Sequence, residues 1–378
     1  MRVALLTELY PPSIGGQELF FEGLGRALVE RGHTVEVFCV GHEAGLPAHE
    51  ILDAIAVYRF PSDPNYRAPT RPWMKRAWPA IFRYAFWTRR VVQSGNYDLV
   101  VLNQWPLLHA VTLPHRMRSR SVLHWCEVRD GRFYAAVQTW LPRFTAHNAA
   151  ISDAVASAIG EASSKPIFGM PSGLRLEAYA SAPREERHGI LSLGRIAEHK
   201  NLPRLVAAFA VLKQRGYPGR LTIAGDGPAM ANLRRAVQAS AVASEISILG
   251  AVDDTEKTRL LAQSELFVLA SRREGFPRVV AEAMASGLPV VTVDLPGNGT
   301  KEVVHAAGCG LVAPADPAAL ADVAQSVLGQ WEDHSRAGRC YAKSLDWAQI
   351  SERLERQMGW TAARPKVSSD AVPSHARR

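Results

Sequence analysis

The chain has 378 residues, 47% of them hydrophobic, which is too long for one ordinary core and enough for two. Its four cysteines are far apart and form no CxxC pair, which argues against a disulfide framework, a zinc cluster or a redox motif. The net charge of +8 favours an anionic partner, such as a nucleotide, a phospholipid surface or nucleic acid. Composition therefore indicates a two-domain globular protein of a reducing compartment.

The N-terminus predicts a strand and not a leader peptide. MRVALLTELYPP carries one positive charge and a short apolar run that meets Glu8 and two prolines. No apolar stretch approaches the ~20 residues that crossing a bilayer requires. We therefore expect a cytoplasmic protein, with peripheral attachment to the inner face of a membrane left open.

Short apolar runs alternate with amphipathic stretches of helix length, a pattern typical of parallel sheets covered by helices. The first half predicts strands near 2–8, 34–40, 55–60, 98–103, 120–126 and 147–151. The second half predicts strands near 189–193, 220–224, 246–249, 265–269 and 289–293. Helices are expected between them, for example Glu18 to Arg31 and Asn201 to Arg215. The predicted fold class is α/β, in two similar halves.

The segment PSGLRLEAYASAPREERHG (171–189) has no clear periodicity and predicts the linker between the halves. We expect one domain over 1–170 and a second over 171–344. A helix within 345–362 is expected to pack back on the first domain. Residues 363–378 lack an apolar pattern and are expected to form a disordered tail.

In open parallel sheets ligands bind beyond the carboxyl ends of the strands, so the loops there are the candidate sites. The first such loop, TELYPPSIGGQE, places Gly15 and Gly16 at the start of a helix. Bare backbone at this position lets a phosphate or sugar approach closely, although a tight turn alone would also explain the glycines. The loop lacks the GxGxxG pattern of dinucleotide enzymes, which weakens a dehydrogenase interpretation.

A second loop, LGRIAEHKN, places Arg195 and Lys200 after the first strand of the second half. Arg offers a planar fork and Lys a point charge, so together they could neutralise one diphosphate. The alternative is a pair of solvated surface cations. The following IAGDGP turn, with Gly225 and Gly227, is interpreted as mainly structural.

A third loop belongs to EGFPRVVAEAMASGLPVV, where Glu274 precedes a predicted helix and Glu282 lies within it. Pro277 suits a first helical turn, and the free amides near Gly275 and Phe276 can hold phosphate or sugar oxygens. The two carboxylates would repel phosphates, so we expect them to accept hydrogen bonds from hydroxyls on either side. The alternative is helix-dipole stabilisation by Glu274 and a solvated Glu282.

A similar loop, DLPGNGTKEVV, follows the next predicted strand. Gly297 and Gly299 precede Thr300, which is the predicted N-cap of the helix that holds Glu302 in its first turn. Several such loops at the strand ends of one domain are hard to explain by turn chemistry alone.

With these motifs in place, the chain resembles the retaining GT-B glycosyltransferases of family 4, the glycosyltransferase group 1 superfamily. The resemblance covers nearly the whole chain and is carried by PPSIGGQE, LGRALVERGHTVEV, LGRIAEHKN, IAGDGP, ILGAVDD, EGFPRVVAEAMASGLPVV, GTKEVV and GCGLVAPAD. The spacing of two glutamates with seven residues between them is the most specific of these marks. The resemblance implies a GT-B fold of two Rossmann-like domains, the first for an acceptor and the second for a sugar nucleotide.

The resemblance also implies site residues. Arg195 and Lys200 would hold the donor diphosphate, Glu282 the ribose hydroxyls, and Glu274 a hydroxyl of the transferred sugar. Gly15 and Gly16 would close over the phosphates. The backbone of Gly275, Phe276 and Pro277 would complete the site, and Gly250 and Ala251 would meet the nucleobase.

The implied activity is transfer of a hexose-type sugar from a UDP-, GDP- or other nucleoside-diphosphate sugar to a hydroxyl acceptor, with retention and without a metal or other cofactor. The implied catalytic residues are Glu274, Arg195 and Lys200. The acceptor is a cell-envelope glycan, a lipid-linked intermediate or a small secondary metabolite, and no nucleic acid is expected. The competing hypothesis is a GT-B scaffold that binds a sugar nucleotide or glycan without catalysis.

One departure concerns a histidine that the family often has at the end of a first-domain strand, here RSVLHWCEVRD. The alignment places Cys126 there, with His124 two residues earlier and Glu127 next. Either His124 takes over the sugar contact, or it is a buried core histidine.

The stretch WMKRAWPAIFRYAFWTRR (73–90) is basic and aromatic and could lie on an anionic membrane surface. Its aromatic side chains could equally cover the first domain's core. Residues 59–90 contain one acidic residue, Asp63, and eight basic residues: Arg59, Arg67, Arg71, Lys75, Arg76, Arg83, Arg89 and Arg90.

Overall fold

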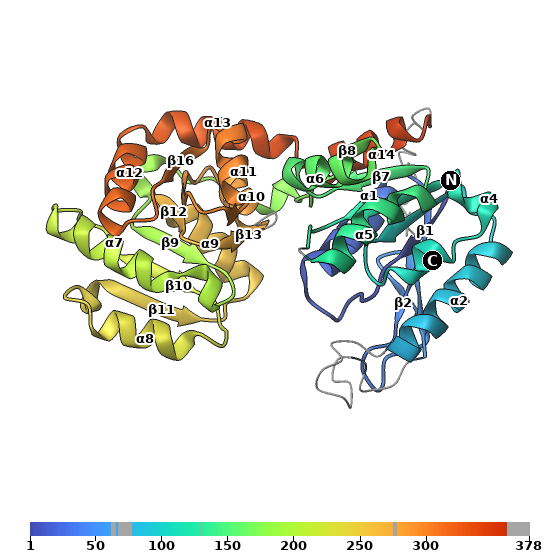
Figure 1. The fold of residues 1–378 in the computed structure, drawn as a ribbon. Helices are drawn as coiled ribbons and strands as arrows, with labels where there is room; N and C mark the ends of the chain where they lie inside the picture. The colour runs from blue at the N-terminus through green and yellow to red at the C-terminus, as the bar shows by residue number, and fades with distance from the viewer. Residues whose placement is uncertain (62–65, 67–77, 130, 275–277, 361–378) are drawn as a thin grey trace, which may run out of the picture. The chain divides into compact units, whose positions relative to one another are not determined.

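The computed structural model describes residues 1–61, 66, 78–129, 131–274 and 278–360, and it confirms the α/β class (Figure 1). Internal contacts divide the chain into two compact units. The first unit holds Met1–His124, Ala136–Asn148 and the chain from Ser351 onward; the second unit holds Trp125–Ala135 and Ala149–Ile350. The expected boundaries at 170/171 and 344/345 stay predictions, and the tail 363–378 lies outside the described residues.

The first sheet has eight strands in the order β3-β4-β2-β1-β5-β6-β7-β8. β1 pairs in parallel with β2 and β5, and β3 pairs antiparallel with β4 at the edge. The apolar central strands are buried on both faces, as parallel strands between helix layers require. The strands are β1 (Arg2–Leu6), β2 (Thr34–Val40), β3 (His49–Leu52), β4 (Ile55–Phe60), β5 (Leu99–Asn103), β6 (Ser121–Trp125), β7 (His147–Ala150) and β8 (Ile167–Gly169).

The second sheet has six strands in the order β11-β10-β9-β12-β14-β16, all parallel. Counted within this unit the order is 3-2-1-4-5-6, the arrangement of a Rossmann sheet. The strands are β9 (Ile190–Leu193), β10 (Leu221–Ala224), β11 (Ile246–Gly250), β12 (Leu266–Leu269), β14 (Val290–Val293) and β16 (Gly310–Ala313).

Helices cover the second sheet on both faces. One core cluster joins strand side chains to Phe209 of α7 and Leu320 of α12, and the other joins them to Leu261 of α9 and Met284 of α10. The helices of the second half are α7 (Leu202–Gln214), α8 (Met230–Gln238), α9 (Asp254–Gln263), α10 (Arg278–Ala285), α11 (Thr300–Ala307), α12 (Pro317–Gly329), α13 (Trp331–Lys343) and α14 (Trp347–Gln357). The earlier helices are α1 (Gly16–Glu30), α2 (Trp78–Ser94), α3 (Leu108–Val111), α4 (His115–Arg118), α5 (Arg132–Trp140) and α6 (Asp153–Ser163).

The end of α14 is anchored in the first unit by a buried carboxylate. Glu355 accepts hydrogen bonds from Arg31 Nε at 2.7 Å and contacts His33 Nε2 at 2.7 Å. Burial would raise the pKa of Glu355, but the hydrogen bonds from Arg31 and His33 hold it below its usual value. The helix is therefore held by charge as well as by its apolar face.

Every strand predicted from an apolar run is present, with ends within two residues of those expected. The short strands β3, β8 and β16 were not predicted, nor was a two-stranded sheet of β13 (Arg273–Glu274) and β15 (Gly297–Asn298). Within the described ranges, no helix combines the length and the apolar character that crossing a bilayer needs.

Candidate functional site

The strand order of the second sheet reverses between β9 and β12, so the loops after these strands flank a crevice where ligands bind in such folds. Arg195 and Lys200 follow β9, and Glu274 follows β12. A small, open hollow lies at the end of β9 and is lined by Gly194, Arg195 and Lys200 among others. The reversal point therefore gathers three of the predicted site residues.

The loop that carries Arg195 is held by the IAGDGP turn. Gly194 N–H donates to Ala224 O at 3.0 Å, and Ile196 N–H donates to Asp226 O at 2.8 Å. A Cβ on Gly225 would overlap the carbonyl oxygen of Gly194, so only glycine permits this approach. The turn is structural, as predicted, and its structural role is to fix the Arg195 loop.

Lys200 and Glu274 form an ion pair, with 2.5 Å between Lys200 Nζ and Glu274 Oε1. Their side chains are 14% and 11% exposed, so water screens the pair only partly. Lys200 comes from a 3-10 turn, Glu198–Lys200, that ends at Asn201 in the left-handed conformation with φ of 53°. The interpretation of Lys200 as a solvated surface cation is therefore wrong.

The backbone around Glu274 is fixed by the small β13–β15 sheet, which aligns Glu274 with Asn298. Gly299 N–H donates to Glu274 O at 2.9 Å. Asn298 is fully buried, and its Nδ2 donates to Thr292 Oγ1 at 2.9 Å and Val293 O at 2.7 Å. Asn298 thus ties the segment opposite Glu274 to the end of β14.

The backbone of His199 also supports this arrangement, because its carbonyl accepts a hydrogen bond from Arg272 N–H at 2.7 Å. Burial and then the charge of Lys200 lower the pKa of His199 below its ordinary value. An imidazole beside Lys200 is thereby kept neutral near pH 7.

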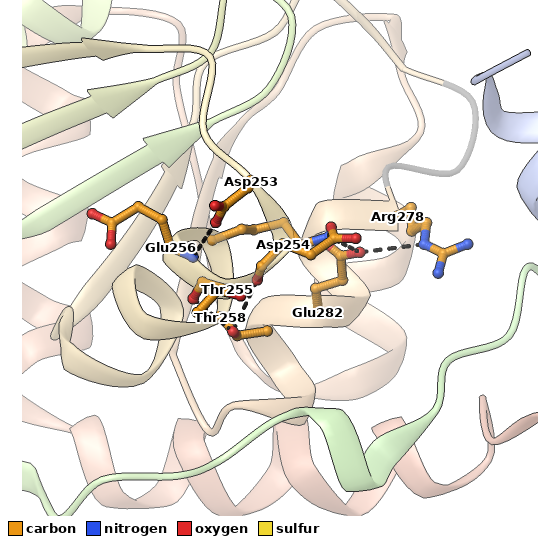
Figure 2. Close-up of polar contacts among 8 residues, drawn as sticks. Asp253, Asp254, Thr255, Glu256, Thr258, Arg278 and Glu282 are labelled. Carbon is orange, nitrogen blue, oxygen red and sulfur yellow. Dashed lines mark hydrogen bonds and ion pairs between the residues drawn. The ribbon is translucent and has the colours of Figure 1, made fainter. Parts of the chain in front are cut away.

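Glu282 lies on α10 and is 4% exposed, so the solvated alternative is wrong. Arg278 Nε contacts its Oε1 at 3.2 Å, and Lys257 Nζ from α9 contacts the same oxygen at 3.4 Å. Figure 2 shows Glu282 facing the first turn of α9, which begins after the N-cap Asp253. Burial, and then the negative charge of Glu282, raise the pKa of Tyr179. Glu282 is a buried carboxylate held by cations from two helices, α9 and α10.

Two further predicted contacts lie in the second unit. Gly250 ends β11 with φ of 77°, and its carbonyl accepts a hydrogen bond from Gly225 N–H at 2.7 Å. Ala251 follows and is exposed. Their contact with a nucleobase stays a prediction, and the predicted amides of 275–277 lie outside the described residues.

The first sheet reverses its order between β1 and β5; Gly15 ends the loop after β1, and Gly16 begins α1. Gly15 is the N-cap of α1, and a Cβ on Gly16 would meet open space. Asn103, at the end of β5, donates to Gln17 Oε1. His109 Nε2 lies 2.7 Å from Asn103 O, and burial lowers the pKa of His109 to about 4.

His124 is 1% exposed and stacks on Phe20 with ring centroids 3.9 Å apart. This is the packing expected of a core histidine, and its sugar contact stays a prediction. Cys126 is half-buried, and Glu127 pairs with Arg129 at 2.7 Å.

Lys257, Asn298 and His199 were missed as site residues. In the sequence, Lys257 and Asp254 have the i,i+3 spacing of an ordinary ion pair on an exposed helix surface, so Lys257 was not singled out. In the part of the chain that the structure describes, His, Cys, Asp and Glu side chains form no group of three that could hold a metal ion.

Two family models match the chain. The model described as Glycosyl transferases group 1 matches residues 177–343, and the model described as Glycosyl transferase 4-like domain matches residues 15–166. The two matches do not overlap and leave out only the ends and a short segment between them.

Individual proteins are similar as well. The chain is 26% identical over 386 residues to a glycogen synthase of Mycobacterium tuberculosis (strain CDC 1551 / Oshkosh), covering 93% of this chain and 92% of that one. It is 32% identical over 202 residues to a phosphatidyl-myo-inositol mannosyltransferase of the same strain, covering 50% and 52%. The structure of Anabaena HepE in complex with UDP-glucose superposes with a TM-score of 0.70 at 18% identity, covering 95% and 99%.

Proposed function

The chain belongs to the glycosyltransferase group 1 superfamily, family 4, with the GT-B fold, and from this premise we propose that it is a retaining hexosyltransferase. It uses a nucleoside-diphosphate sugar as donor and a hydroxyl group as acceptor. The observation that carries the proposal is the Lys200–Glu274 ion pair beside the Arg195 loop, at the strand-order reversal of the second sheet. The complex of HepE with UDP-glucose supports a nucleotide-sugar donor.

The donor is held along its length by different groups. Arg195 and Lys200 bind the diphosphate, whereas donor contacts by Gly15, Gly16 and 275–277 stay expectations from the sequence. Glu274 accepts a hydrogen bond from a sugar hydroxyl, and Glu282 accepts from the ribose. Cations suit the phosphates and carboxylates suit the hydroxyls.

The ion pair suggests how donor binding exposes Glu274. Without donor, Lys200 and Glu274 neutralise each other. A diphosphate carries more negative charge than one carboxylate and takes over the Lys200 ammonium. Glu274 then turns its oxygens to a hydroxyl of the sugar. Removing either partner alone leaves the other partly buried and unpaired, which costs more than losing a surface pair.

In the transfer step the acceptor oxygen forms a bond to the anomeric carbon on the face from which the diphosphate leaves. The bond between that carbon and the diphosphate oxygen breaks, and the acceptor proton passes to the departing diphosphate. Arg195 and Lys200 stabilise the negative charge that develops there, as preorganised cations do for other leaving groups. No metal is assigned a part in this proposal.

The direct test is a transfer assay with UDP-, GDP-, dTDP- and ADP-sugars, followed by proton NMR of the product. We expect turnover with one nucleotide family and an anomeric configuration the same as in the donor. An inverted product would overturn the retaining mechanism. Transfer that persists unchanged in Glu274→Ala and Lys200→Ala would overturn the site assignment.

The acceptor is a cell-envelope glycan, a lipid-linked intermediate or a small secondary metabolite. The similar proteins named above include one glycogen synthase and one phosphatidyl-myo-inositol mannosyltransferase, so relatives differ in acceptor class. The scaffold alternative predicts donor binding with no turnover on any acceptor. The ion-paired Lys200 and Glu274 favour the enzyme.

We also propose peripheral contact with an anionic membrane through α2. One face of α2 packs on the core through Ile81 and Tyr84, whereas Trp78, Phe82 and Phe86, spaced four residues apart, are 37%, 50% and 57% exposed. Four-residue spacing places these three rings along one side of the helix. The helix has no acidic residue, and its cations Arg83, Arg89 and Arg90 are exposed. The predicted residues 73–77 lie outside the described chain.

This contact is tested by sedimentation with vesicles of phosphatidylglycerol and phosphatidylcholine. We expect binding at low salt that high salt reverses and that Phe82→Ser with Phe86→Ser abolishes. Phe133→Ser, at an equally exposed phenylalanine on α5, is the control and should leave binding unchanged. The proposal would be contradicted if the wild type did not bind vesicles at low salt, or if Phe133→Ser lost as much binding as the α2 variant.

A further inference from the structure

Lys257 joins two helices through charge. Its Nζ lies 2.7 Å from Asp254 Oδ1, one turn earlier on α9, and 3.4 Å from Glu282 Oε1 on α10. We infer that Lys257 is a positioning residue for the donor's ribose, because it holds the Glu282 carboxylate in the orientation that accepts the ribose hydroxyls. The inference rests on the proposed function, which assigns Glu282 to the ribose.

The two contacts of Lys257 differ in how far they are buried. The side chain of Glu282 is 5% exposed, that of Lys257 is 20% exposed and that of Asp254 is 94% exposed. A charge interaction is stronger where water is excluded, so the contact with Glu282 is the less screened of the two. Asp254 thus holds the ammonium from the solvent side, and its own pKa is lowered by the hydrogen bond from Lys257.

Glu282 has acceptor capacity to spare for a ligand. An ionised carboxylate offers about four lone-pair positions. Lys257 and Arg278 both contact Oε1. Figure 2 shows the Glu282 carboxylate between Arg278 and the start of α9. Two donors fix the group and leave room for a hydroxyl.

Lys257 differs from Arg278 in what it fixes. Arg278 is four residues from Glu282 on α10, so this pair restrains the side chain against its own helix. Lys257 belongs to α9, so its contact sets Glu282 relative to a second helix. Holding a glutamate side chain in advance reduces the entropy that ligand binding would otherwise cost.

The experiment is calorimetric titration with the nucleoside diphosphate that the wild type binds, UDP or GDP, and with its 2′,3′-dideoxy counterpart. The ratio of the two affinities measures ribose-hydroxyl recognition alone. We expect Lys257→Met to weaken the ribose form roughly tenfold while the dideoxy form changes less than about twofold. Lys257→Arg should recover part of the ratio.

The matched control is Arg259→Met on the same helix, where Arg259 pairs with Glu256 through two exposed side chains. It should leave both affinities unchanged. Equal weakening of both ligands by Lys257→Met would show a merely structural role and overturn the inference. Should that variant fail to fold, Lys257→Gln, which keeps a donor and much of the length, gives the same readout.

Glu282→Gln separates this inference from the proposed function. If Glu282→Gln lowers the ratio and Lys257→Met does not, the positioning role fails and the ribose assignment stands. If the wild type does not distinguish the two ligands, or Glu282→Gln leaves the ratio unchanged, the ribose assignment fails and the inference fails with it.

Discussion

The loops after β9 and β12 and the loops after β1 and β5 occupy equivalent places, at the reversal of strand order in their own sheets, yet their chemistry differs. The second-unit loops carry Arg195, Lys200 and Glu274, with the last two paired. The first-unit loops bring together Asn103, Gln17 and His109, and the loop after β1 also holds the buried carboxyl group of Glu8. A diphosphate needs cations, whereas a hydroxyl needs neutral or acidic hydrogen-bonding groups. We therefore assign the donor to the second-unit loops and the acceptor to the first-unit loops.

The largest expected effect is at Lys200. Lys200→Ala removes the cation that stabilises the departing diphosphate and leaves Glu274 unpaired, so kcat should fall about 10³-fold. Steady-state kinetics with donor and acceptor measure it. Lys213→Ala is the control, because Lys213 is a cation on α7 that lies 3.9 Å from Glu245. A loss of less than about tenfold, or an equal loss in the control, would contradict the charged character of the donor site.

The next effect tests whether burial keeps His109 of the first-unit loops neutral. Burial lowers the pKa of His109 to about 4, against an ordinary value of 6.5. Because the folded pKa is lowered, the unfolded chain binds the proton first as pH falls, and stability is lost between about pH 6.5 and pH 4. Above about pH 6.5 the lowered pKa of His109 contributes roughly 3 kcal/mol to the free energy of unfolding.

His109→Gln removes this titration. Urea unfolding at pH 7 and pH 4 should show a smaller loss of stability in the variant than in the wild type. An equal loss in both proteins would mean that burial does not keep His109 neutral in the folded state.

A smaller effect is expected where the Arg195 loop is held. Gly225→Ala would force the Cβ against Gly194 O, displace the loop and lower kcat/KM about 100-fold. Gly216→Ala is the control, since Gly216 also has positive φ, 87°, but faces open space. Both substitutions place alanine at a positive φ and so strain the backbone. Only Gly225→Ala also displaces the Arg195 loop, so a difference in activity reports that displacement. Equal activity in the two would show that the turn does not position Arg195.

The smallest effect tests the glycines of the first unit. A Cβ on Gly16 meets open space, so Gly16→Ala should leave the melting temperature unchanged. If a phosphate approaches this backbone, the donor KM should rise roughly fivefold. Gly169→Ala, also facing open space, is the control. An unchanged donor KM would remove Gly15 and Gly16 from the donor site.

The sequence predicted the sheets because buried parallel strands are short continuous apolar runs. It missed β13 and β15, since two residues carry no periodic signal. It named Thr300 as the N-cap of α11, but Gly299 is the N-cap and Asn298 Oδ1 accepts from Thr300 N–H instead. The helix therefore begins at Thr300, one residue earlier than side-chain capping rules suggest.

The candidate site was predicted in part. Charged residues after strands pointed to Arg195, Lys200 and Glu274, because strand ends of a parallel sheet converge. Lys257 escaped notice since its contact with Glu282 depends on how two helices pack. Arg59 was grouped with the basic stretch, but it is 3% exposed and pairs with Glu50 at 2.5 Å, so it adds nothing to that surface.

The central claim is that the donor's phosphates lie on Lys200 while its sugar lies on Glu274. Calorimetric titration of the wild type, Lys200→Ala and Glu274→Ala with a nucleoside diphosphate and with the matching sugar nucleotide tests it directly. Lys200→Ala should weaken both ligands, whereas Glu274→Ala should weaken the sugar nucleotide and spare the diphosphate. Equal weakening of both ligands by Glu274→Ala would contradict the account.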